Sequence, residues 1–178
     1  MARFNYNSKC AHPIVCKRLM KEFIQDLTTE KVELKEDYNF YTVIANNNIA
    51  NDILIGYNFK ILMETCYACF RQNFFSRANY AKGFSSVTLV LLHELGHQKI
   101  KNTMPSDYYP IKRNLNVFRI QQDYNEKRID ELKFHSMYMA LPDEFAATQW
   151  AIDWLTVKEN RQKAKEFEKK FFKVWRGK

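Results

Sequence analysis

Residues 90–99 read VLLHELGHQK and place His93 and His97 four positions apart, with Glu94 between them. In an α-helix, residues at i and i+4 lie on one face with Cβ atoms about 6 Å apart, so both imidazoles can bind one metal ion. Glu94 lies roughly 100° round the helix from His93, where its carboxylate can hold a water near that ion. The H-E-x-x-H pattern is therefore typical of a zinc site with its own general base.

The residues around this motif make a chance match an improbable explanation. A chain of this composition is expected to contain roughly 0.006 accidental copies of the pattern. Glu94 is the only charged residue between Val90 and His97, and the apolar run predicts a helix that passes through the core, capped by Ser85 or Ser86. The alternative is a buried helix whose histidines only bond to neighbouring groups. Lys99 stands where zincins usually have an apolar residue.

A catalytic zinc site generally has three protein ligands and one open position for water. The third ligand must come from elsewhere in the chain, and the downstream candidates are Glu126, Glu131, His135, Asp143 and Glu144. We favour Glu144, because the small residues Ala147 and Ala151 share its helix face and allow close packing against the metal-bearing helix. His135 is the second choice. Asp143 fits better as a charge at a helix N-terminus.

The HELGH motif, followed by a helix with Glu144, Ala147 and the pair Trp150-Ala151, resembles the ImmA/IrrE-type metallo-endopeptidases of bacteria, phages and integrative elements. The resemblance covers residues 90–99 and 141–155. It implies a minimal zincin fold, Zn²⁺ bound by the two histidines and Glu144, and a catalytic role for Glu94. It further implies an intracellular protease that cleaves a repressor-type regulator. The alternative is a non-catalytic binding or regulatory protein of a phage or mobile element that keeps a structural metal.

Outside the motif, the patterning predicts one α+β domain over residues 1–178 with a predominantly helical C-terminal half. Short segments rich in β-branched and aromatic residues predict a three-stranded sheet, in which residues 52–57 form an edge strand that pairs with an extended substrate. The segments expected to be strands are 32–35, 40–45 and 52–57. Those expected to be helices are 12–27, 60–78, 85–100, 121–141 and a last helix that runs, with or without a bend, from 142 towards 175, and the longest irregular segment is 102–116.

The basic character of the chain is concentrated at its C-terminal end. The net charge is +8, and residues 155–178 contain nine Lys or Arg against three Glu. Phe167, Phe171 and Trp175 recur at helical spacing, so the segment predicts a basic amphipathic helix that docks through an aromatic stripe and exposes its lysines. Contacts of these lysines with an acidic partner or with nucleic acid are the alternatives, but no base-reading motif is present.

The remaining features bear on location and on secondary roles. No apolar run approaches the roughly 20 residues of a spanning helix, and the first residues lack a secretory signal, so we expect a cytoplasmic protein without membrane contact. The four cysteines are expected to be free thiols, with a structural zinc site as the alternative; they are Cys10, Cys16, Cys66 and Cys69. Four side chains are candidates to stabilise an oxyanion, although each is more typical of a structural role: Tyr108, Tyr109, His135 and Tyr138.

Overall fold

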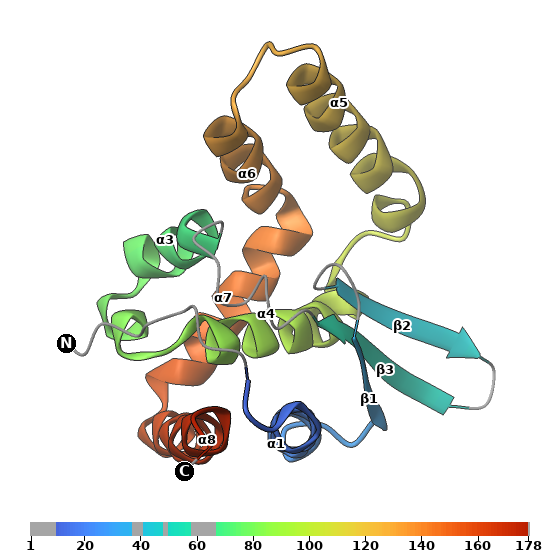
Figure 1. The fold of residues 1–178 in the computed structure, drawn as a ribbon. Helices are drawn as coiled ribbons and strands as arrows, with labels where there is room; N and C mark the ends of the chain where they lie inside the picture. The colour runs from blue at the N-terminus through green and yellow to red at the C-terminus, as the bar shows by residue number, and fades with distance from the viewer. Residues whose placement is uncertain (1–9, 37–40, 48–49, 58–66, 178) are drawn as a thin grey trace.

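The computed structural model describes residues 10–36, 41–47, 50–57 and 67–177 (Figure 1). In chain order the elements are α1 (Pro13–Gln25), β1 (Val32–Glu36), β2 (Tyr41–Asn47), β3 (Ala50–Tyr57), α3 (Tyr67–Arg77), η1 (Asn79–Gly83), α4 (Ser86–Ile100), η2 (Lys101–Thr103), η3 (Tyr108–Arg113), α5 (Asn114–Asn125), α6 (Glu131–Met139), α7 (Pro142–Thr156) and α8 (Lys158–Trp175). No described helix is both long and apolar enough to cross a membrane.

The three strands form one small sheet in the order β1-β3-β2. β1 runs parallel to β3, and β2 runs antiparallel to it. Val32 pairs with Ile53 and Leu34 pairs with Ile55, so alternate residues of the two strands bury one shared face. Because β3 lies in the middle of the sheet, the prediction that residues 52–57 form an edge strand is wrong; β1 and β2 are the edges.

The predicted α+β class is also wrong in its balance, because the described part of the chain is mainly helical. The strands have five, seven and eight residues, whereas α8 has 18 and α4 and α7 have 15 each. Most of the buried apolar side chains lie on helices that pack against other helices, chiefly α4 with α7 and α1 with α8. The local β-propensity of a few short segments therefore overstated how much of the fold the sheet provides.

Two predicted segments need correction. The helix expected over 121–141 is interrupted, because Lys127 has a positive φ of 57° beyond the end of α5 and the Asp130 side chain accepts a hydrogen bond from the Lys133 amide at the start of α6. The segment expected to be irregular, 102–116, contains η3, a π-helical turn, and the start of α5. The last helix, expected with or without a bend, divides at Val157, whose backbone is extended. Of the helix expected over 60–78, residues 60–66 lie outside the described part.

Helix α4 occupies the centre of the molecule (Figure 1). Helix α7 crosses it, α1 and α8 lie side by side on one side, the sheet lies near its C-terminal end, and α5 and α6 project on the side opposite α1 and α8. The expected cap is confirmed, since the Ser85 side chain accepts from the Thr88 amide. Glu168 of α8 accepts hydrogen bonds of 2.6 Å from the Ser85 amide and the Thr88 hydroxyl. The negative charge of this carboxylate interacts favourably with the positive N-terminal end of the α4 dipole, and the two hydrogen bonds join α8 to α4.

The C-terminal helix docks as its aromatic stripe predicts. Phe167, Phe171 and Trp175 are buried, and the Phe23 ring of α1 stacks on Phe167 with ring centroids 4.4 Å apart. The exposed basic residues of α8 and its C-cap lie on the other faces; they are Lys158, Lys163, Lys165, Lys169, Lys170, Lys173 and Arg176. A docked amphipathic helix explains this pattern without a nucleic-acid ligand.

Gly96 allows α4 and α7 to approach closely. A Cβ at this position would lie 2.5 Å from the backbone oxygen of Ala147 and 3.0 Å from its Cα. These are backbone atoms of a helix, so they cannot rotate aside as a flexible side chain could. The small residues predicted to permit close packing of the glutamate-bearing helix, Ala147 and Ala151, are both fully buried.

We expect Gly96→Ala to lower the free energy of unfolding by about 1–3 kcal/mol, because the two helices must separate to admit the methyl group. In an open helix interior the same exchange would raise stability by roughly 0.5–1 kcal/mol. Chemical denaturation measures the difference. Gly83→Ala is the matched control, since a Cβ there has no atom within 4 Å. Equal stability of Gly96→Ala and wild type would contradict this account of the contact.

Candidate metal centre

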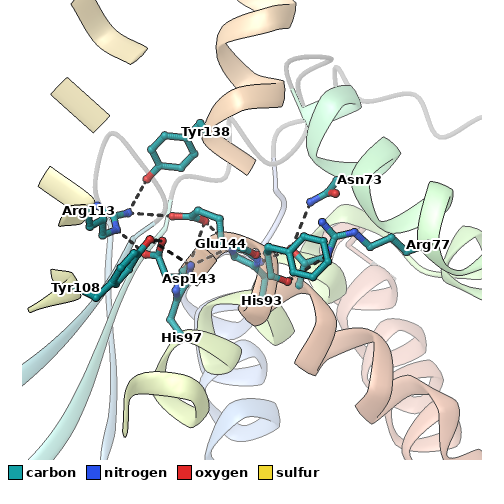
Figure 2. A network of polar contacts seen from close by, with 11 residues as sticks. Asn73, Arg77, His93, His97, Tyr108, Arg113, Tyr138, Asp143 and Glu144 are labelled. Atoms are coloured by element: carbon teal, nitrogen blue, oxygen red, sulfur yellow. Dashed lines mark hydrogen bonds and ion pairs between the residues drawn. The ribbon is translucent and has the colours of Figure 1, made fainter. Parts of the chain in front are cut away.

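Three side chains from two helices converge beside the crossing of α4 and α7 (Figure 2). His93 and His97 come from α4, and Glu144 comes from the first turn of α7. Glu144 Oε2 lies 3.0 Å from His93 Nε2 and 3.3 Å from His97 Nε2, and the two Nε2 atoms are 3.1 Å apart. His93 and Glu144 are buried, and 15% of the His97 side chain is exposed. These three residues could hold a metal ion.

The distances between the three atoms fit a tetrahedral ion. Zinc bonds to imidazole nitrogen or carboxylate oxygen of about 2.0–2.1 Å place any two ligand atoms roughly 3.3–3.4 Å apart. The observed separations of 3.0, 3.3 and 3.1 Å form a triangle of nearly that size. Only small movements of the side chains would be needed to bring all three atoms into contact with one ion, and the fourth corner of the tetrahedron is not supplied by these residues.

Thr148, one turn after Glu144, determines which nitrogen of His93 carries its proton. The Thr148 hydroxyl donates its single hydrogen to the Glu144 backbone oxygen at 2.9 Å, so it can only accept from His93 Nδ1, which lies 3.1 Å away. Neutral His93 therefore carries its hydrogen on Nδ1 and turns the lone pair of Nε2 towards Glu144. In that tautomer a lone pair meets a carboxylate oxygen 3.0 Å away, so a close contact of the two atoms needs a proton or a metal ion between them. The group is therefore suited to a metal ion.

The pKa values of Glu144 and His97 also indicate that the group favours a bound cation. Burial alone would raise the pKa of Glu144, but hydrogen bonds and charge from His93 and His97 hold it well below its ordinary value. Burial alone would lower the pKa of His97, but the hydrogen bond and charge of Glu144 outweigh this effect and raise it. The carboxylate is thus ionised in a buried place, where a positive charge is needed to balance it.

Glu94 lies between the two histidines on α4 and is itself buried. Its negative charge contributes to the raised pKa of His97, so the carboxylate is near the metal-binding group. The rings of Phe70 and Phe74 meet the His93 ring edge-on, with centroids 5.2 and 6.5 Å away. These aromatic contacts hold the imidazole in place and keep water from that side of it.

Arg113, at the end of η3, is the main residue of the site that sequence reasoning missed. Its Nε lies 2.5 Å from Asp143 Oδ2, and its Nη2 lies 3.0 Å from Glu144 Oε1 and 3.0 Å from the Tyr138 hydroxyl. Tyr108 donates to the other oxygen of Asp143 at 2.6 Å. In the sequence Arg113 has no distinguishing pattern, because it falls in a segment that was expected to be irregular.

The other candidate ligands do not join the group. Glu126 pairs with Arg128, and Glu131 lies 3.7 Å from His135 Nε2 on α6. Asp143 is fully buried between Tyr108 and Arg113, so it does more than place a charge at a helix terminus. Within the described residues, Glu144 lies with the two histidines in a group that could hold a metal ion, and His135, the second choice, does not join that group.

Among the four candidates for oxyanion stabilisation, Tyr138 shares its donor, Arg113 Nη2, with Glu144 of the metal-binding group. Its hydroxyl accepts from Arg113, and burial together with the charge of Glu144 raises its pKa to about 12, so the hydroxyl keeps its proton at neutral pH. The hydroxyl of Tyr108 is committed to Asp143, and His135 faces Glu131. Burial raises the pKa of Tyr109, whose ring meets the Tyr108 ring edge-on.

The cysteines lie apart from this centre where the structure describes them. The Sγ atoms of Cys10 and Cys16 are 3.2 Å apart, and both thiols are free. Cys66 and the side chain of Cys69 lie outside the described residues, which leaves the four-cysteine zinc site a prediction.

No protein-family model, curated protein or solved structure matches the chain.

Proposed function

We propose that this protein is a zinc-dependent metallo-endopeptidase that hydrolyses a peptide bond in an intracellular protein substrate. The observation that supports it best is the donor set: two imidazoles of an H-E-x-x-H helix and one carboxylate from a second helix, held at the separations of a tetrahedral face. Two histidines and a glutamate with one open position form a known type of catalytic zinc site, whereas structural zinc sites are closed by four protein ligands.

The residues of the site have separate tasks in this proposal. His93, His97 and Glu144 would hold the ion, which when bound supplies a Lewis acid that lowers the pKa of a water and polarises the scissile carbonyl. Glu94 takes the proton from the attacking water and delivers it to the leaving amine. Tyr138 keeps its proton, and its hydroxyl donates to the negative oxygen that develops on the carbonyl.

The proposed substrate is an extended segment of a protein. β1 is flanked by α1, while β2 is the edge strand that contacts α4, so β2 replaces β3 as the strand proposed to pair with the substrate. The resemblance of the HELGH segment to ImmA/IrrE-type peptidases suggests a repressor-type regulator as the substrate and the cytoplasm as the compartment.

The experiment is a metal and cleavage assay on the purified full chain. We expect about one zinc per chain by elemental analysis, and new N-termini by mass spectrometry when the zinc-loaded protein is incubated with a denatured bacterial proteome. Chelation should remove these termini and added zinc should restore them. Zinc-loaded protein that produces no metal-dependent termini would instead favour the non-catalytic metal-binding alternative.

A further inference from the structure

Arg113 divides the two oxygens of Glu144 between two partners. Glu144 Oε2 faces the imidazoles of His93 and His97, while Oε1 accepts from Arg113 Nη2 at 3.0 Å (Figure 2). The guanidinium reaches Glu144 and the neighbouring Asp143 from one side chain, because its N–H groups form a planar fork. Only 24% of the Arg113 side chain is exposed, so water competes weakly for these bonds.

The π-helical turn η3 places the residues that make this contact. Hydrogen bonds between residues five apart widen the turn, and Tyr108 and Arg113 are five residues apart at its two ends. Both side chains bind Asp143, Tyr108 through Oδ1 and Arg113 through Oδ2. Asp143 is thereby held on both oxygens, and it in turn holds the guanidinium against Glu144.

We propose that Arg113 is a positioning residue that makes Glu144 a one-oxygen metal ligand and so keeps the fourth coordination position free for water. This inference rests on the proposed function. If Oε1 were released, the carboxylate could bind the ion through both oxygens and raise its coordination number. With water still bound, the ion would then have five ligands instead of four, and the water would no longer have the open corner of a tetrahedron to itself.

The charge of Asp143 explains why a cation is tolerated so close to a metal site. Asp143 balances the positive charge of Arg113 through a contact of 2.5 Å, so the charge of Glu144 remains available for the metal ion. The Tyr138 hydroxyl accepts from Arg113 Nη2, the nitrogen that also donates to Glu144, so both Nε and Nη2 have defined partners. A lysine has a single charged centre and cannot hold both carboxylates in this fixed geometry.

The test compares Arg113→Met and Arg113→Lys with wild type, using two readouts that do not depend on peptidase activity. The first is zinc affinity by competition with a chromophoric chelator, which we expect to fall about 10- to 100-fold in both variants. The second is the visible spectrum of the Co²⁺-substituted protein. Four-coordinate cobalt absorbs much more strongly than five-coordinate cobalt, so we expect weaker absorption in both variants.

Arg77→Met is the matched control. Arg77 also binds the first turn of α7, through the Phe145 backbone oxygen at 3.1 Å and over the Phe145 ring at 3.8 Å, but it contacts none of the three metal-binding residues. We expect its zinc affinity and cobalt spectrum to match wild type. A change in Arg77→Met equal to that in Arg113→Met would show a general effect on α7 and overturn the inference.

Arg113→Lys keeps the positive charge, so it tests the positioning role of Arg113 if Arg113→Met does not fold. Wild-type zinc affinity and cobalt absorption in Arg113→Lys would overturn the positioning role. Absence of zinc binding by wild type would be a different result, because it would remove the proposed function itself. A wild-type protein that binds zinc, together with unchanged Arg113 variants, would leave the metal site standing and remove only the role of Arg113.

Discussion

Replacement of Glu94 by Gln is expected to abolish peptide hydrolysis while the protein still binds zinc. Gln keeps the size of the side chain, but its amide cannot take a proton from water, so the loss should be about 10²- to 10⁴-fold, the range of a general base. His93, His97 and Glu144 are unchanged in this variant, and the three-atom geometry that fits the ion does not include Glu94. Zinc content should therefore remain at the wild-type level.

The measurement pairs elemental analysis with the rate at which metal-dependent termini appear. Glu131→Gln is a matched control, because this exposed glutamate on α6 lies 3.7 Å from His135 Nε2 and outside the metal-binding group. It should keep both zinc and activity. An equally active Glu94→Gln protein would end the assignment of Glu94 as the base, and loss of zinc from it would show that the side chain supports the metal instead.

The central helix and its histidines could be predicted from the sequence because the information is local. The cap at Ser85, the apolar run and the four-residue spacing of His93 and His97 all lie within one short segment. Glu144 could be predicted from a less specific signal, the small residues that follow it on the same helix face. Ala147 does allow close packing of the two helices, since its backbone lies where a Cβ of residue 96 would be.

The features that were missed depend on contacts between distant parts of the chain. Arg113 acquires its role only when η3 is brought beside α7, 30 residues further on, and nothing near it in the sequence indicates that partner. The central position of β3 depends on its parallel pairing with β1, which local β-propensity cannot specify. The break after α5 depends on one residue, Lys127, in a left-handed conformation for which glycine or asparagine is the usual signal.

Removal of the Glu144 carboxylate should have the largest effect on metal binding. In Glu144→Ala the ion would lose its only anionic ligand, so we expect zinc affinity to fall by more than the roughly 10- to 100-fold typical of an outer contact. The change also leaves Arg113 with one carboxylate partner fewer in a half-buried place. Thermal unfolding in the absence of metal is needed to separate that effect from the loss of the ion.

His135→Ala is the control, because His135 was the second candidate for the third metal ligand. His135 lies on α6 and contacts Glu131 rather than the site, so the zinc affinity of the His135→Ala protein should equal that of wild type. Wild-type affinity in Glu144→Ala combined with loss of zinc in His135→Ala would reverse the assignment. Because the ion needs a negative charge at the crossing of α4 and α7, where Glu144 is held ionised by two imidazoles, we expect the opposite result.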